Sequence, residues 1–450
     1  MADDNEVTVL ADEVQSLTVS PEGQRASVTD QRLPDELLEM IAKETDFDDL
    51  KNLALANKWL SEACKPMLWR SVTVEGDFEK HEDKMVLLVS AGVGRYIRKI
   101  DYTQPQPLSK LSALHLSTFT GLEEVLLNLE AAADGEETGR DRHAVPHALS
   151  DALKRLSKLK YLHLERYGSF ADTSFSLAHH LPQLDELLIP TFPYISADTD
   201  LPFIHPAPLA LRRLEIGFDS FAAQGIASTA GTVKELLIGN RIFRDWDVEP
   251  LDYLEDLKEV FDSLVEGSKT SPWPLEKLWL AEFQMGSDPE HFEALLGLLS
   301  SLKHSSVWEL KISGFMSFTY STSNTAFSLP SITHLDLQAG TEDIDRCFLD
   351  EDTFISLSAF LLCFPNLQKL TLANWTFTLD PTEVLRLVRE SKSELKTYWP
   401  LYKPLLGFLR TSTRITEVWF EQRRYNSPFD SFLKIGRRSN GAFYLQAYII

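Results

Sequence analysis

The sequence predicts an α/β protein in which a short three-helix segment precedes a long, irregular repeat solenoid built on a parallel sheet. Residues 33–70 concentrate apolar side chains within about forty positions, which is too short a length to enclose them in a core of its own. Downstream, one spaced apolar pattern recurs eleven times between Ile97 and Phe420, with stretches of helical periodicity between the copies. Strands that alternate with helices along a chain indicate a parallel sheet.

The composition is that of a globular protein and disfavours several classes of function. Of the 450 residues, 44% are apolar and 25% are charged, and the net charge is −23. This charge disfavours nonspecific binding to nucleic acid or to anionic membranes, which needs basic patches. The first thirty residues lack a basic-then-apolar signal pattern, and no apolar run approaches the length that spans a bilayer, so we expect a cytoplasmic protein, a nuclear protein or both. Three scattered cysteines without a CxxC pair predict neither disulfides nor a cysteine zinc site.

The N-terminal part divides into an arm and a helical segment. Residues 1–30 are acidic and polar and contain no aromatic residue, a composition that predicts a disordered arm. Residues 31–74 predict three short helices. The first begins at Pro34, which suits a helix first turn; the second follows Asp46, a plausible N-cap; and the third covers about Asn57 to Pro66.

The remainder, residues 75–450, is predicted to be the solenoid. The repeated pattern is an aliphatic residue, two variable positions, an aliphatic residue, one variable position and a final apolar residue. It begins at Ile97, Leu122, Leu159, Leu184, Leu211, Val233, Leu275, Val307, Ile332, Leu367 and Ile415. Between copies, helical periodicity marks Pro146 to Ser157, His291 to Lys303, Phe354 to Cys363 and Pro381 to Glu394. Strands joined by helical crossovers are expected to lie parallel in one sheet.

A closed βα barrel and an open leucine-rich solenoid both fit this order of elements. Barrel strands are covered on both faces and read as continuous apolar runs, whereas here His163, Glu215 and Asp336 alternate with aliphatic residues. One face of the sheet is therefore expected to meet water, which favours the solenoid. The spacing between copies varies from roughly 22 to nearly 50 residues, and two further, degenerate repeats are expected around Leu257 to Val260 and near Leu395.

The helical segment resembles an F-box, a motif of about forty residues. The resemblance rests on Leu33-Pro34-x-Glu36-Leu37-Leu38-x-x-Ile41, Asp49-Leu50-x-x-Leu53, Lys58-Trp59 and Leu68-Trp69-Arg70 in the expected order. An F-box followed by irregular leucine-rich repeats is similar to the fungal-type substrate receptors of SCF cullin–RING ubiquitin ligases. The resemblance implies adaptor-facing or F-box core positions at Leu33, Pro34, Leu37, Leu38, Ile41, Leu50, Leu53 and Trp59.

The variable strand positions are expected to line the water-facing side of the sheet, where repeat proteins tend to bind partners. Trp279 and Trp419 stand out because a large aromatic ring directed at water is a typical recognition anchor. The candidate partner-binding residues are Tyr161, Arg213, Lys277, Trp279, Lys311, Asp336 and Trp419.

Catalytic and metal-binding patterns are missing from the sequence. It contains no GxSxG elbow, no HExxH motif and no glycine-rich phosphate loop, so we expect a non-catalytic protein without a metal or cofactor. The resemblance implies a receptor whose F-box binds a Skp-family adaptor, and through it a cullin and a RING protein, while the repeats bind an unidentified protein to be ubiquitinated. The alternative hypothesis is an adaptor-bound scaffold that acts in assembly or trafficking outside a cullin ligase.

Overall fold

The structure is a computed structural model of the chain and describes seventeen segments of it. They are residues 35–56, 58–74, 78–102, 110–128, 144–165, 176–189, 209–217, 231–239, 254–255, 257–262, 273–281, 289–315, 327–340, 351–375, 414–422, 431–437 and 443–449. The predicted N-terminal arm, Leu33, Pro34, the helix expected at Pro381 to Glu394 and the repeat near Leu395 lie outside these segments. The chain forms two compact units, Met1–Asn128 with Asp134–Leu159, and Leu129–Ala133 with Lys160–Ile450.

The first unit begins with three helices, α2 (Asp35–Glu44), α3 (Phe47–Ala56) and α4 (Lys58–Leu68). The amide of Asp49 donates to Oδ1 of Asp46 at 3.0 Å, which confirms the N-cap expected for the second helix. Helix α4 packs against both α2 and α3. The core between them consists of Ala42, Leu50 and Cys64, with Leu53, Ala54, Met67 and Leu68 packed around it.

The other described elements of the first unit are three parallel strands of the sheet and the helices that follow them along the chain. In chain order its elements are β1 (Ser71–Thr73), α5 (Phe78–Ser90), β2 (Lys99–Tyr102), α6 (Lys110–Leu116), β3 (Glu124–Asn128) and α7 (Ala144–Leu153). Strand β2 pairs with β1 on one side and with β3 on the other. The repeat pattern predicts β2 and β3 but not β1, because Trp69 stands where the pattern has its first aliphatic residue.

The second unit is a parallel-sheet repeat solenoid. Its strands are β4 (Tyr161–Glu165), β5 (Glu186–Ile189), β6 (Arg213–Gly217), β7 (Glu235–Gly239), β8 (Lys277–Ala281), β9 (Glu309–Phe315), β10 (His334–Ala339), β11 (Lys369–Ala373) and β12 (Glu417–Gln422). Each pairs with the next in parallel. Its labelled helices are α8 (Leu177–His180), α11 (Pro289–Ser301), η2 (Leu302–His304) and α12 (Glu351–Leu361). Together with β2 and β3 of the first unit, these nine strands are the eleven that the repeat pattern predicts, so all eleven are confirmed.

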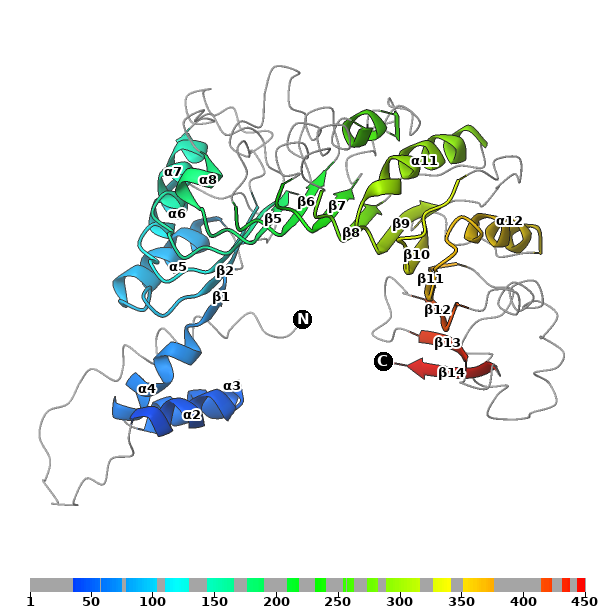
Figure 1. Cartoon of the computed structure of the whole chain (residues 1–450). Coiled ribbons are helices and arrows are strands. Elements are labelled where there is room, and N and C mark those ends of the chain that lie inside the picture. The colour runs from blue at the N-terminus through cyan, green and yellow to red at the C-terminus, as the bar shows by residue number, and fades with distance from the viewer. Residues whose placement is uncertain are drawn as a thin grey trace, which may run out of the picture. The chain divides into compact units, whose positions relative to one another are not determined.

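The register of the sheet explains how the repeat pattern builds a core. The middle aliphatic residue of each copy pairs with its counterpart on the next strand, and all of them are buried. This core row of the second unit is Leu162, Leu187, Leu214, Leu236, Leu278, Leu310, Leu335, Leu370 and Val418. Figure 1 shows α11 and α12 on one side of the strands. Phe292 of α11 stacks on Phe315 of β9 with the ring centroids 6.1 Å apart, and it meets Phe360 of α12 edge-on, so the helices close the core on this side.

Two parts of the second unit differ from the prediction. After β12 the sheet continues with β13 (Ser431–Arg437) and β14 (Phe443–Ile449), which pair antiparallel to their neighbours. The sheet is therefore not parallel throughout, because the connections at its end are too short for helical crossovers. The repeat expected around Leu257 to Val260 is also wrong. Residues 257–262 are helical, and β7 pairs directly with β8.

Candidate functional site

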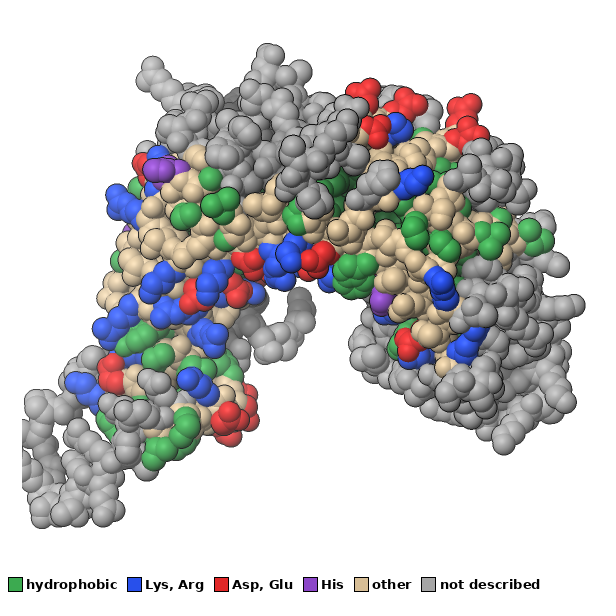
Figure 2. All heavy atoms as spheres, viewed as in Figure 1, with side chains coloured by type: hydrophobic (Ala, Val, Ile, Leu, Met, Phe, Trp, Pro, Cys, Tyr) green, Lys and Arg blue, Asp and Glu red, His purple; other side chains and the backbone are tan. Residues whose placement is uncertain are grey.

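A stripe of exposed apolar side chains runs along helix α2. Leu37, Met40 and Ile41 have 41%, 54% and 44% of their surface exposed. Residues three and four apart share one face of a helix, so these side chains lie next to one another. On α3, Phe47 and Leu55 are also exposed, and green hydrophobic surface is visible on these helices in Figure 2. An exposed apolar surface of this kind typically binds another protein.

The structure separates the predicted adaptor-facing residues into two groups. Leu38 and Leu50 are 3% exposed, and Leu53 packs against the core of Ala42, Leu50 and Cys64. Leu37 and Ile41 are exposed, and Trp59 is half-buried. A mixture of helix-core and surface positions is expected, because the spacing of apolar residues does not reveal which face of a helix meets its own neighbours.

The water-facing side of the second unit carries two rows of side chains in register, three of which, Leu188, Leu237 and Thr371, are buried among their neighbours. Row one consists of Tyr161, Glu186, Arg213, Glu235, Lys277, Glu309, His334, Lys369 and Glu417. Row two, two residues further along each strand, consists of His163, Leu188, Glu215, Leu237, Trp279, Lys311, Asp336, Thr371 and Trp419. Of the seven predicted partner-binding residues, Tyr161, Arg213 and Lys277 lie in row one and the other four in row two. The structure therefore brings all seven onto one face.

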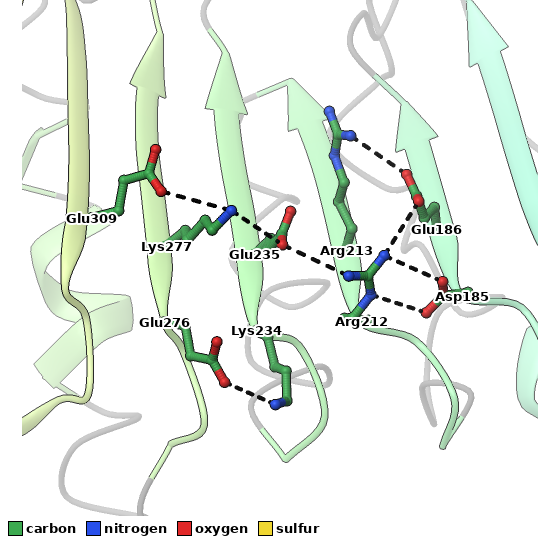
Figure 3. A network of polar contacts seen from close by, with 9 residues as sticks. All are labelled: Asp185, Glu186, Arg212, Arg213, Lys234, Glu235, Glu276, Lys277 and Glu309. Atoms are coloured by element: carbon green, nitrogen blue, oxygen red, sulfur yellow. Dashed lines mark hydrogen bonds and ion pairs between the residues drawn. The ribbon is translucent and has the colours of Figure 1, made fainter. Parts of the chain in front are cut away.

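A network of ion pairs crosses strands β5 to β9 on this face (Figure 3). The ammonium of Lys277 lies 3.5 Å from a carboxylate oxygen of Glu235 and 3.6 Å from one of Glu309. A guanidinium nitrogen of Arg213 lies 3.4 Å from a carboxylate oxygen of Glu186. Cations and carboxylates alternate along row one because each pairs with the opposite charge on the adjacent strand. Such exposed pairs contribute roughly 0–1 kcal/mol each to stability, so their main effect is to neutralise the surface.

Just before the strands, the residues that precede row one extend the same network. Arg212 lies 3.4 Å from Asp185, 3.5 Å from Glu186 and 3.9 Å from Glu235. Lys234 lies 2.8 Å from Glu276. The hydrogen bond from Lys234 lowers the pKa of the Glu276 carboxyl. These residues stand just before the strand positions that the sequence predicts to face water. The repeat pattern therefore does not point to them, because only the register shows which charges of distant repeats meet.

Trp279 is not an isolated aromatic anchor. The ammonium of Lys311, on the neighbouring strand, lies 4.0 Å from the centroid of the Trp279 ring. The same ammonium lies 3.5 Å from a carboxylate oxygen of Asp336. Among the described residues, the shielded indole Nε1 of Trp279 has no hydrogen-bond partner. A cation over the ring covers part of the surface that a partner would contact.

Trp419 lies in a second cluster, on strands β12 and β13. Its Nε1 donates to Oε2 of Glu417 at 3.0 Å, and the ammonium of Lys434 lies 4.7 Å from the ring centroid. Lys434 also donates to Oε1 of Glu417 at 2.6 Å. The hydrogen bond from Lys434 is the main cause that lowers the pKa of Glu417, so this carboxylate is ionised at neutral pH. Lys434 is not apparent from the repeat pattern, because it belongs to the antiparallel hairpin.

Histidine, cysteine and acidic side chains are scattered over the described part of the chain. Within it, no cluster of three or more His, Cys, Asp or Glu residues could hold a metal ion. Cys64 and Cys363 are buried free thiols, and burial raises the pKa of the Cys64 thiol, which disfavours the reactive thiolate. None of the described helices is long and apolar enough to cross a membrane.

Comparison with known proteins leaves the chain without an assigned family. No protein-family model matches the sequence, and no curated protein matches it. Among solved structures, one match is the crystal structure of human 5T4 (Wnt-activated inhibitory factor 1, trophoblast glycoprotein). It is 17% identical in sequence, with a TM-score of 0.28 over 66% of this chain and 78% of that chain. A TM-score this low does not demonstrate a shared fold, so the fold is defined by the strand order and register of the chain itself.

Proposed function

We propose that the chain is a non-catalytic interaction protein that joins two other proteins. In this proposal, helices α2 to α4 form an F-box that binds a Skp-family adaptor, and the water-facing sheet of the second unit binds a protein to be ubiquitinated. The chain would then be the substrate receptor of an SCF-type cullin–RING ubiquitin ligase.

The observation that supports this proposal most strongly is the exposed stripe of Leu37, Met40 and Ile41. It belongs to the segment whose sequence resembles an F-box, and its residues are too exposed to serve the helical core. Protein interfaces of standard size bury about 800 Å² per partner around a few aliphatic or aromatic anchors. The stripe, together with Phe47 and Leu55 on the next helix, offers such anchors.

The test is binding of the purified full chain to a purified Skp-family adaptor. The double variant Leu37→Ala with Ile41→Ala removes anchors without opening the core, so we expect its affinity to fall at least tenfold while its circular dichroism stays unchanged. The matched control is Leu114→Ala with Ile355→Ala. It removes the same two side-chain types from exposed positions on α6 and α12, and we expect it to bind like the wild type.

Three outcomes decide between the alternatives. Equal binding by both double variants, or no adaptor binding by the wild type, would contradict the proposal. Recovery of cullin and RING protein with the adaptor-bound chain from cells supports the ligase receptor. Adaptor binding without cullin favours the alternative, a scaffold that works with the adaptor outside a ligase.

A further inference from the structure

Six cations of the water-facing sheet in the second unit share a feature that Lys369 lacks. Each of six cations on this face has a carboxylate oxygen at 3.5 Å or less. They are Arg212, Arg213, Lys234, Lys277, Lys311 and Lys434. Lys369 in row one has no such partner among the described residues. It is a cation at the same kind of position, but its ammonium reaches the nearest row-one carboxylate, that of Glu417, only as a longer-range electrostatic interaction.

The two neighbours of Lys369 in row one explain why it lacks a partner. Lys277 has Glu235 on one adjacent strand and Glu309 on the other, whereas Lys369 has Glu417 on β12 and His334 on β10. Both carboxylate oxygens of Glu417 already accept hydrogen bonds, Oε1 from Lys434 and Oε2 from Trp419. Glu417 is therefore engaged by other groups.

His334 supplies no negative charge on the other side. Its Nδ1 lies 2.9 Å from the hydroxyl of Thr333, and its ring meets that of Trp308 edge-on at 5.1 Å between centroids. Burial lowers the pKa of His334, so the imidazole is neutral at neutral pH. Lys369 thus lies between a neutral ring and a carboxylate that is hydrogen-bonded to two other groups.

Aromatic rings flank the Lys369 side chain on both sides. Its ammonium lies 5.6 Å from the centroid of the half-buried Trp419 ring, and His334 and Trp308 stand on the opposite side. A partly exposed aromatic surface beside a single cation suits a peptide that has an apolar side chain next to an anionic one.

We propose that Lys369, with His334 and Trp419 on either side, is the specificity subsite of the sheet face and binds an aspartate or glutamate side chain of a partner protein. This inference rests on the proposed role of the sheet as the partner-binding surface and names the chemical class of that partner. The proposed subsite lies on strands β10 to β12. It is therefore separate from the network on β5 to β9, where cations and carboxylates pair with one another.

Charge complementarity favours a carboxylate over a phosphate group. The single ammonium of Lys369, which has no short ion pair among the described residues, matches one negative charge. A phosphorylated side chain carries about −1.5 to −2 at neutral pH and would meet Lys369 with the carboxylate of Glu417 close by.

The experiment is a selection of random twelve-residue peptides displayed on phage against the immobilised full chain. We expect the wild type to enrich peptides that have Asp or Glu at one fixed position beside an apolar residue. Lys369→Gln is expected to lose this enrichment of acidic peptides. Lys369→Glu is expected to enrich peptides that have Lys or Arg at the same position instead. Lys303→Gln is the control, because Lys303 is an exposed lysine on η2, away from the sheet face.

Synthetic copies of an enriched peptide, with Glu, Gln or phosphoserine at the fixed position, give the affinities. We expect Lys369→Gln to weaken binding of the Glu peptide by about ten- to a hundredfold and to leave binding of the Gln peptide unaffected.

Tighter binding of the phosphoserine peptide than of the Glu peptide would overturn the carboxylate assignment. A wild type that enriches no acidic peptide, or a Lys369→Gln variant that enriches the same ones, would overturn the subsite. Adaptor binding by these variants is measured in parallel, so that failure of the subsite is distinguished from failure of the proposed function.

Discussion

At the scale of single residues, His334 gives the second unit a dependence of stability on pH. Burial lowers its pKa in the folded protein below the ordinary value of 6.5. As pH falls below 6.5, the unfolded chain takes up this proton before the folded chain does, so the free energy of unfolding decreases. Glu309 and Glu417 oppose this shift and Lys369 reinforces it.

We therefore expect acidification from pH 7.5 to 5.5 to destabilise the wild type more than His334→Gln. The slope of the unfolding free energy against pH should differ between the two proteins by at most about 1.4 kcal/mol per pH unit. The difference is smaller in practice, because water reaches part of the His334 ring and screens its charge. Urea unfolding at several pH values, followed by tryptophan fluorescence, measures it. Parallel pH profiles for the two proteins would show that His334 titrates alike in the folded and unfolded states.

At the scale of elements, neighbouring residues of one strand have opposite roles. Leu278 on β8 is 1% exposed and belongs to the core row, whereas Lys277, one position earlier, forms two ion pairs on the water-facing side. We expect Leu278→Ala to lower the free energy of unfolding by about 2–5 kcal/mol and Lys277→Ala to lower it by less than about 1–2 kcal/mol.

Urea denaturation compares these two variants, and hydrogen exchange localises the effect. In a repeat protein each strand contacts only its neighbours, so Leu278→Ala should reduce amide protection in β7, β8 and β9 first. Similar destabilisation by both variants would contradict the assignment of the two faces.

The same contrast shows what the sequence reveals about each element. The alternation of aliphatic and polar residues defines the eleven repeat strands and their faces, because side chains along a strand point alternately to opposite sides. It does not reveal which charges meet. Arg213 and Glu186 are 27 positions apart, and their 3.4 Å contact depends on the register of strands joined by long connections. For the same reason, Lys369 looks like any other charged position until the partners of Glu417 are known.

At the scale of the whole molecule, the two candidate surfaces belong to different compact units. The apolar stripe of α2 lies in the first unit, and the Lys369 subsite lies in the second. The helical core of Ala42, Leu50 and Cys64 shares no residue with the core row beneath row one. A protein that joins an adaptor to a partner needs two surfaces that bind at the same time.

We therefore expect the effects of substitutions on the two surfaces to be independent. In the triple variant Leu37→Ala, Ile41→Ala, Lys369→Gln, the adaptor affinity should match that of Leu37→Ala with Ile41→Ala to within about twofold. Its peptide affinity should match that of Lys369→Gln equally well, because separate sites usually add within about 0.3–0.5 kcal/mol. Isothermal titration with the adaptor and with the selected Glu peptide measures both affinities. A larger departure in either one would show that the two surfaces are energetically coupled, and the chain would then be a regulated receptor and not a passive bridge.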